Sequence, residues 1–570
     1  MPVAHRRGRI WRTIRNSPGI QISLYFIAFA LLIGLYTIIV HSFYPLLENR
    51  PISWANALFF VVQSMTTVGN TELPHFGNSL TMILSIQIIL TGVIMIFIVV
   101  PLLVAPFVIT LLAPTPPRKT PHALSGHVVV FGYDEIIRSM IDSLAISDHD
   151  IVIIEQDKAL ALGIATNYRK RAYVVWGDYT DPNTWSGAHV ADAGHIVISK
   201  DERLTANIVL GIRDLAQGKI ISIVDKLSFD RYLRYAGAEH VLSPKDTTGW
   251  ILARHAVFTM SGNTTPEVPG LEQVHVNSRN HSIHELRLIN IPVVRGCNAE
   301  GKTLKDLHLY EKYGVVALFL WKKGNFIQWP VDEEKVDITT SLFLFGKADA
   351  VRAAVHDEFD SDGRRDALAI IAGFGDVGAA AYQELRSNGI TCVVVDLKQH
   401  GVNQVIGNAE DEEILRRAHI EQAQFCVVAL NSDDVNVFTT LMVRNLNPLI
   451  RILARANEPT SVDKLYRAGA DYVALLPTIG GQTIARTVLA DRVTILLDLP
   501  NGEMVIIKVV TAQKPTTVSW FVKKTGVRII GIEGPGRTVV APGPEETLTN
   551  RDVAIAVGNN EQLKKFIRLL

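Results

Sequence analysis

The chain has 570 residues, of which 48% are hydrophobic, and its lysines plus arginines balance its aspartates plus glutamates at 56 each. Its mean hydropathy of +0.21 is high for a soluble protein. Without a basic excess, we expect no nucleic-acid partner. The three cysteines, Cys297, Cys392 and Cys426, lie far apart in sequence and form no CxxC pattern, so neither a disulfide framework nor a cysteine zinc site is indicated.

The apolar excess is concentrated in the first fifth of the chain. Between Asn16 and Pro117 the only charged residues are Glu48, Arg50 and Glu72, whereas the rest reads as ordinary soluble protein. We therefore expect the first part to be embedded in membrane lipid and the remainder to be soluble.

Two segments in this part are long enough to cross a bilayer. Residues 19–43 would form a helix of about 37 Å and residues 80–112 one of about 50 Å, against a hydrocarbon core of about 30 Å. The first segment is too long for a signal peptide and has no small-residue cleavage site, so we expect it to be retained.

Basic residues flank both segments and predict their orientation. Arg118 and Lys119 follow the second segment, and five arginines precede the first: Arg6, Arg7, Arg9, Arg12 and Arg15. By the positive-inside rule, both ends face the cytoplasm and the connecting loop faces outside. We expect a multi-pass protein of the inner (cell) membrane with a cytoplasmic N-terminus.

The connecting loop contains a third apolar segment, residues 53–65, with Ser53 as a candidate helix N-cap. This segment is too short to cross and predicts a re-entrant helix. Irregular backbone at membrane depth is tolerated only where it is buried in protein or lines a water-filled path, so the residues that follow should line a pore. They are Thr66, Thr67, Val68, Gly69 and Asn70. The alternative is a simple two-helix membrane anchor.

The run TTVG resembles the start of the potassium-channel selectivity filter, TTVGYG. The resemblance implies that the Thr67 hydroxyl and the carbonyl groups of Thr67, Val68 and Gly69 replace an ion's hydration shell. The family's Tyr-Gly-Asp is here Asn70, Thr71 and Glu72. Thr71 is β-branched and stands in place of the second filter glycine, which is unfavourable for the outer ion sites. A weakly selective cation channel is therefore an alternative.

The second spanning segment contains candidate bend points at Gly92, Pro101 and Pro106, where an inner helix could open at its cytoplasmic end. Helix packing explains these residues equally well, because glycine and proline are common in membrane helices. A proline-rich, semi-rigid linker follows at residues 113–124.

Beyond the linker the chain repeats itself. Residues from His127 and from Ala367 each read as apolar strand, glycine turn, helix and β-branched strand ending in an acid. Gly132 corresponds to Gly373, and Glu155 to Asp396, at the same offset. These patterns predict two copies of one α/β domain with a doubly wound parallel sheet.

The glycine turn of the second copy predicts a nucleotide site. Gly373, Gly375 and Gly378 form GxGxxG between strand and helix, a pattern that lets a pyrophosphate approach the helix N-terminus, and Asp396 could accept a ribose hydroxyl. Asp376 and Val377 complete the turn; Asp376 puts a negative charge near the phosphate, which Arg455 could offset.

The first copy retains less of this pattern. It keeps Gly132 and Glu155 as candidate nucleotide-binding residues, but Asp134 and Glu135 stand in the turn and disfavour phosphate.

Each copy is followed by a smaller β-rich region, residues 280–359 and 491–570. The soluble part resembles tandem RCK domains, the Rossmann-like regulators of potassium conductance, each with a smaller C-terminal α+β lobe. The whole chain resembles two-helix prokaryotic potassium channels of the multi-ligand-gated GsuK type. The implied domains are a pore domain (1–112), the linker (113–124), a first RCK domain (125–360) and a second RCK domain (361–570).

The resemblance implies a homotetramer around one K⁺-conducting pore, gated by NAD or ADP bound to a cytoplasmic ring of RCK domains. It also implies a possible calcium site, for which Asp178, Asp201 and Glu202 are the matching carboxylates. Nucleotide would act as an effector, and we expect no enzymatic activity. The alternatives are a membrane-anchored NAD-dependent dehydrogenase and a regulatory subunit of a separate transporter.

Overall fold

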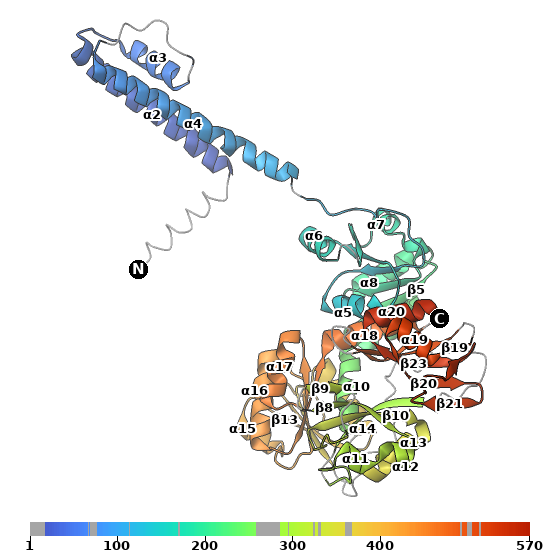
Figure 1. The fold of residues 1–570 in the computed structure, drawn as a ribbon. Helices are drawn as coiled ribbons and strands as arrows, with labels where there is room; N and C mark the ends of the chain where they lie inside the picture. The colour runs from blue at the N-terminus through green and yellow to red at the C-terminus, as the bar shows by residue number, and fades with distance from the viewer. Residues whose placement is uncertain are drawn as a thin grey trace. The chain divides into compact units, whose positions relative to one another are not determined.

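The computed structural model describes residues 18–66, 68, 77–112, 114–168, 171–257, 286–293, 296–322, 325–328, 332–359, 367–490, 493–498, 504–511 and 515–570. The chain divides into two compact units, one up to residue 115 and one from residue 116 onward. We describe each by itself (Figure 1).

The first unit consists of three helices, α2 (Pro18–Glu48), α3 (Trp54–Met65) and α4 (Ser79–Leu112). The stretches Tyr25–Glu48 and Ser79–Ile98 are long and apolar enough to cross a membrane, whereas α3 is a shorter apolar helix. The α3 helix begins at Ser53, whose side chain accepts a hydrogen bond from the Asn56 N–H at 3.1 Å. Both spanning helices and the short helix therefore follow the sequence prediction closely.

Side chains from all three helices form a small core in this unit: Tyr36, Val40, Tyr44, Ala57, Phe60, Val61, Met65 and Ile88. The Glu48 carboxylate at the end of α2 accepts hydrogen bonds from the Gly77 and Asn78 N–H groups, both at 3.0 Å, and from the Thr81 hydroxyl. It thereby ties α2 to the start of α4. Large apolar side chains such as Leu31 and Phe97 are exposed, as expected for surfaces that face lipid or another subunit.

The second unit contains the two predicted α/β copies. The first copy comprises β1 (Val128–Phe131), α5 (Glu135–Ser143), β2 (Ile151–Glu155), α6 (Lys158–Asn167), β3 (Tyr173–Trp176), α7 (Pro182–Gly187), β4 (His195–Ser199), α8 (Glu202–Ile212), β5 (Lys219–Ile223), α9 (Asp230–Ala236), β6 (His240–Leu242) and α10 (Pro244–Val257). The second comprises β11 (Leu368–Ala372), α14 (Asp376–Ser387), β12 (Thr391–Asp396), β13 (Gln404–Ile406), α15 (Glu412–Arg417), β14 (Phe425–Val428), α16 (Asp433–Leu446), β15 (Arg451–Ala456), α17 (Pro459–Ala468), β16 (Tyr472–Leu475) and α18 (Leu476–Leu489).

Both copies form a six-stranded sheet of the same topology, β3-β2-β1-β4-β5-β6 and β13-β12-β11-β14-β15-β16. All neighbouring strands that are paired within these sheets run parallel. This is the doubly wound order, in which the chain reverses direction across the sheet at the first strand, and ligands bind at the carboxyl ends of the strands there. The fold class predicted from the sequence is confirmed.

Each copy leads into a smaller antiparallel lobe. The first lobe contains β7 (Leu286–Pro292), α11 (Leu304–Leu307), α12 (Leu309–Tyr313), β8 (Val316–Lys322), β9 (Asn325–Gln328), β10 (Thr340–Lys347) and α13 (Ala348–Ala354). The second contains β17 (Val493–Asp498), β18 (Val505–Val510), β19 (Thr516–Thr517), α19 (Val518–Thr525), β20 (Arg528–Gly534), β21 (Arg537–Val540), β22 (Thr547–Leu548), β23 (Val553–Gly558) and α20 (Asn560–Leu569). Apolar faces of the two lobes pack against each other, with Phe319 and Phe345 against Ile506 and Ile555.

The two copies interlock by exchanging their last helices. Leu252 and Ala253 of α10 are buried in the core beneath the second sheet, and Ile484 and Val488 of α18 are buried in the core of the first. In Figure 1, α18 lies beside α5 and α10 lies beside α14. The two predicted domains are therefore parts of one packed unit.

Candidate functional site

The glycine turn of the second copy connects β11 to α14 at the carboxyl edge of its sheet. Gly373 has a positive φ of 93° and donates its N–H to the Val395 carbonyl at 2.9 Å. A Cβ on Gly378 would lie 2.0 Å from the Gly373 carbonyl oxygen, so only glycine lets the helix pass this close to the turn. These two glycines shape the turn.

Gly375 has a different role, because its surroundings are open. A Cβ built on Gly375 would meet only the Asn431 side-chain oxygen, at 3.8 Å. The residue is the N-cap of α14 and provides no side-chain cap. The N-terminus of α14 is therefore uncapped and uncrowded at Gly375, the arrangement that accommodates a phosphate at a helix N-terminus.

Asp396 ends β12 next to this turn. Its carboxylate accepts hydrogen bonds from the Phe374 N–H at 2.7 Å and the Lys398 N–H at 2.8 Å, and it lies 3.2 Å from Nε2 of His400. Partial burial raises the pKa of Asp396, but these two N–H groups and His400 outweigh it and hold the pKa below its ordinary value. Asp396 is therefore a fixed, ionised acceptor at the position where a ribose hydroxyl would bind.

Two lysines of the first copy offset the negative charge of Asp376. The Lys245 ammonium lies 3.4 Å and the Lys226 ammonium 3.8 Å from the Asp376 carboxylate. Lys245 also pairs with Asp225 at 2.9 Å. The sequence alone did not single out these lysines, because they come from the other copy and are brought to the turn by the exchange of α10. They make the turn less repulsive to phosphate than its own residues suggest.

Arg455 lies at the end of β15 and is buried. Its guanidinium donates to the Asn457 side-chain oxygen at 2.6 and 3.0 Å. Burial lowers the pKa of Arg455, and the nearby Asp433 and Asp376 oppose that shift. Asp433 accepts hydrogen bonds from Asn457 and Glu458 N–H groups. Arg455 thus interacts electrostatically with Asp376 without forming an ion pair with it. The close ion pairs of Asp376 are made by Lys226 and Lys245.

The corresponding turn of the first copy is already occupied by its own side chains. The Asp134 carboxylate caps α5 through the Ile137 N–H at 2.8 Å and accepts a hydrogen bond from the Ser199 hydroxyl at 2.6 Å. A Cβ on Gly132 would lie 2.0 Å from Cε of Lys200. A phosphate would have to displace a carboxylate of its own charge from this helix N-terminus.

Glu155 at the end of β2 is buried, with an exposed fraction of 3%. Its Oε1 accepts from the N–H groups of Gln156 at 2.8 Å and Asp157 at 3.0 Å and from the Tyr179 hydroxyl at 2.7 Å. Glu155 thus corresponds to Asp396 in position, but it is closed in by Tyr179.

Comparison with known proteins identifies the repeated unit. The TrkA-N domain family matches residues 128–244 and 369–476, one match per copy. Both copies are TrkA-N domains. The matches begin at the first strand of each sheet and end at the last, so they cover the two parallel sheets described above.

Among curated relatives, Potassium channel protein 1 of Methanocaldococcus jannaschii is 29% identical over 217 residues, which is 35% of this chain and 65% of that relative. The Ktr system potassium uptake protein A of Vibrio alginolyticus is 23% identical over 35% of this chain and 96% of its own length. The chain thus spans just under two thirds of the channel relative and nearly all of the uptake protein.

Among solved structures, the GsuK channel bound to NAD is 26% identical with a TM-score of 0.55, covering 96% of this chain and 98% of that chain. The GsuK channel itself gives 26% identity and a TM-score of 0.56 over 97% and 99%. The similarity extends over both the helical unit and the tandem TrkA-N unit, and it supports the GsuK-type resemblance seen in the sequence.

The predicted calcium residues do not converge on one ion. Asp178 follows the edge strand β3 and accepts from Thr180, whereas Asp201 follows β4 and caps α8. Three strand steps separate β3 from β4, a distance of roughly 14 Å. Glu202 accepts the Asp225 N–H at 3.3 Å. Within the described residues, no group of three or more histidine, cysteine, aspartate or glutamate side chains could hold a metal ion. A calcium site formed by Asp178, Asp201 and Glu202 therefore stays a prediction.

The predicted filter is described only in part. Thr66 ends α3 and donates its N–H and hydroxyl to the Val62 carbonyl at 2.9 and 2.7 Å, and the Val68 N–H donates to Gln63 at 3.2 Å. Thr67, Gly69 and Asn70 lie outside the described residues.

The candidate gate residues lie in one continuous helix. The α4 helix runs through Gly92, Pro101 and Pro106 to Leu112. A Cβ on Gly92 would lie 2.2 Å from the Met65 carbonyl oxygen. Close packing against the end of α3 therefore requires glycine here, whether or not the helix also bends at this point.

Proposed function

We propose that the chain is the subunit of a potassium channel that is gated by an adenine nucleotide bound to its second TrkA-N domain. The observation that carries this proposal is the open N-terminus of α14 beside the ionised Asp396, in a chain that is similar over nearly its whole length to the GsuK channel bound to NAD. The same position in the first TrkA-N domain is filled by Asp134 and Lys200.

In this proposal the first unit supplies the pore. The α2 and α4 helices span the inner membrane, and α3 ends at the predicted filter residues Thr66–Asn70. The Thr67, Val68 and Gly69 carbonyl groups coordinate K⁺, and the TrkA-N domains and the N-terminus lie in the cytoplasm. NAD and ADP both fit the acidic ribose acceptor and the open turn, and we propose them as effectors.

We further propose that four subunits assemble around the pore. Large apolar side chains are exposed on α8, α9 and their connections in the first domain and on and after α16 in the second: Leu210, Leu215, Phe229, Tyr232, Tyr235, Phe438, Leu441 and Leu449. Such exposed patches at matching places of both copies support contacts between TrkA-N domains of neighbouring subunits.

The linker is the element that connects nucleotide binding to the pore. The Pro117 carbonyl accepts the Trp176 N–H at 2.7 Å, the Thr120 N–H donates to Gly187 at 3.0 Å, and the Arg118 guanidinium lies 4.6 Å from the centre of the Trp176 ring. The linker is therefore attached to β3 and α7 of the first domain rather than free along its length. Movement of that domain would pull on α4 through only a few residues.

The energy required is modest. Shifting a gate from about 1:99 to 99:1 takes about 5.5 kcal/mol of differential binding, so four sites need to supply about 1.4 kcal/mol each.

The proposal is tested by K⁺ efflux from liposomes that contain the purified full-length protein, with and without NAD. We expect NAD to change the efflux rate of the wild type. Gly375→Asp places a carboxylate in the open phosphate position, so it should abolish this response while leaving basal efflux. An unchanged NAD response in Gly375→Asp would place the effector site elsewhere.

A weakly selective cation channel of the same architecture is the second candidate, and the observation that favours it is Asn70, Thr71 and Glu72 in place of the filter's usual Tyr-Gly-Asp. Similarity to proteins named as potassium channels and potassium uptake proteins supports a non-enzymatic role.

A further inference from the structure

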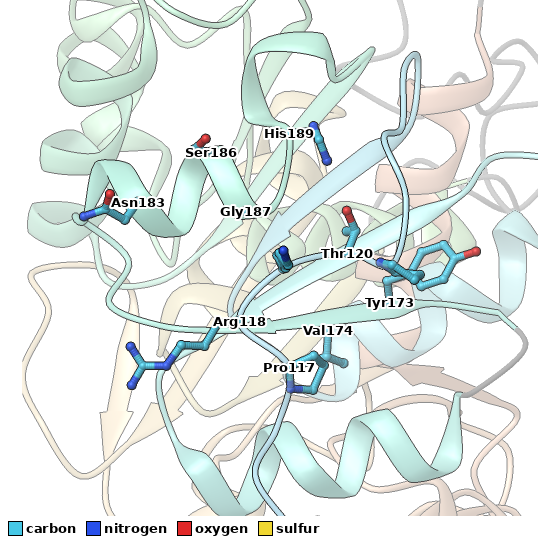
Figure 2. A pocket seen from close by; sticks show the side chains of 11 residues that line it. Pro117, Arg118, Thr120, Tyr173, Val174, Asn183, Ser186, Gly187 and His189 are labelled. Carbon is cyan, nitrogen blue, oxygen red and sulfur yellow. The ribbon is translucent and has the colours of Figure 1, made fainter.

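A cavity of about 940 Å³ lies between the docked linker and the first TrkA-N domain. The linker residues Pro117–Pro121 form one wall, and β3 and α7 form the other (Figure 2). A Cβ on Gly187 would lie 2.5 Å from the Arg118 carbonyl oxygen, so the linker passes directly over the end of α7. The volume of the cavity falls within the range of small-molecule binding sites.

The lining of this cavity is cationic. It contains Arg118, Lys119 and His189 but no aspartate or glutamate. Arg118 is engaged by the Trp176 ring. Among the described residues, the side chains of Lys119 and His189 form no hydrogen bond or ion pair, and Lys119 is exposed. The cavity therefore offers unpaired positive charge and donors to a ligand.

The other lining groups would suit the remainder of an organic anion. Asn183 and Ser186 supply an amide and a hydroxyl group, whereas the Thr120 hydroxyl already donates to the His122 carbonyl at 2.8 Å. Tyr173 with Pro117 and Pro121 supplies flat apolar surface. Figure 2 shows Thr120, Tyr173 and His189 around the same opening, with Asn183 and Ser186 on α7. A lysine beside hydroxyl donors is a common setting for phosphate.

We propose that this cavity binds a soluble organic phosphate with a flat apolar group, at a site separate from the nucleotide turn. We assign a soluble source rather than a lipid headgroup, and the titration below distinguishes the two sources. A ligand here touches both the linker and the domain that holds it. Its binding stabilises the docked linker and adds a second input to the connection between the TrkA-N domains and the membrane helices.

The test is isothermal titration of the full-length protein in detergent with phenyl phosphate, in the presence of NAD so that the nucleotide turn is occupied. Benzyl alcohol serves as the uncharged analogue, and dioctanoyl phosphatidate as the lipid source. The variant Lys119→Glu combined with His189→Gln removes the Lys119 ammonium and the His189 imidazole. Lys523→Glu is the matched control, since Lys523 is an exposed lysine on α19 that does not line the cavity.

We expect phenyl phosphate to bind the wild type and Lys523→Glu equally, and to bind the double variant at least tenfold more weakly at an unchanged melting temperature. Benzyl alcohol should not bind. Equal affinity in all three proteins, or no binding of phenyl phosphate, would overturn the site. If dioctanoyl phosphatidate binds and phenyl phosphate does not, the proposal that the ligand is a soluble phosphate would be wrong. Because binding is read without current, the result is independent of whether the pore conducts K⁺.

Discussion

At the scale of single residues, Asp396 and Glu155 show how one position in a repeated domain acquires two roles. Both acids end the second strand of a TrkA-N sheet and accept backbone N–H groups. Glu155 is only 3% exposed and is closed in by the Tyr179 hydroxyl, whereas the Asp396 side chain is 19% exposed beside His400. The greater exposure of Asp396 is what makes the second domain the candidate nucleotide site.

Asp396→Asn removes the charge while keeping the size of the side chain. Hydrogen bonds to a charged acceptor contribute about 1.5–3 kcal/mol, so we expect NAD or ADP affinity to fall roughly 10- to 100-fold. Calorimetric titration of the full-length protein measures this directly. Glu155→Gln is the matched change in the first domain and should leave nucleotide affinity unaltered; the reverse pattern would place the main site in the first domain.

His255 gives the contact between the two domains a pH dependence. It lies on α10, and its ring stacks on Tyr472 of the second domain with centroids 3.7 Å apart. Burial and then the nearby Arg451 lower the pKa of His255 to about 3. In the unfolded chain the histidine takes up a proton near pH 6.5. Lowering the pH from about 6.5 toward 3 therefore favours the unfolded chain by up to about 1.4 kcal/mol per pH unit.

His255→Phe keeps the stacked ring but removes the titrating group. We expect the drop in melting temperature between pH 7.5 and pH 5.0 to be smaller in His255→Phe than in the wild type, as measured by thermal unfolding of the full-length protein. Equal drops in both proteins would show that other groups dominate the acid sensitivity.

Residue-level roles were only partly predictable from the sequence. The spacing of Gly373, Gly375 and Gly378 before Asp396 was sufficient to place the turn, because strand, turn and helix are local. Lys226 and Lys245 were not identifiable, because they reach Asp376 only through packing between domains far apart in sequence. The calcium residues stay a prediction for a similar reason: proximity to strand ends in the sequence does not show which strands are neighbours.

At the scale of elements, the exchange of α10 and α18 holds the TrkA-N domains together. A Cβ on Gly249 of α10 would lie 2.4 Å from the Val377 carbonyl oxygen of α14, and one on Gly481 of α18 would lie 2.5 Å from the Met140 N of α5. At Gly249, α10 thus packs directly against the backbone of α14, and at Gly481, α18 packs directly against the backbone of α5. The sequence predicted two α/β copies, but it could not show that the last helix of each copy covers the sheet of the other.

Gly249→Leu should force α10 away from α14. Overpacking of this kind costs about 1–3 kcal/mol, so we expect a lower melting temperature and weaker coupling of nucleotide to efflux. Gly163→Ala is the control, because α6 leaves open space around Gly163 and alanine is the better helix former. If the melting temperature of Gly249→Leu equals that of the wild type, α10 and α14 do not pack as closely as in the structure.

At the scale of the whole molecule, two units with different chemistry are joined by a short connection. The helical unit exposes apolar surface typical of membrane segments, and the soluble unit carries one open and one closed TrkA-N turn. The sequence predicted this order of parts well, because hydropathy and internal repeats are properties of long segments. Ion selectivity could not be predicted in this way, since in the proposed tetramer it depends on filter backbones from several subunits and on the unusual residues Asn70, Thr71 and Glu72.

The central claim is that nucleotide bound to the TrkA-N domains controls a K⁺-selective pore. The most direct test is the current through the purified protein in a planar bilayer, with K⁺ on one side and Na⁺ on the other, before and after NAD or ADP is added to the side that bears the TrkA-N domains. We predict a reversal potential near the K⁺ equilibrium potential and an open probability that changes with nucleotide. A reversal potential near zero would contradict K⁺ selectivity, and an open probability that ignores both nucleotides would contradict the gating.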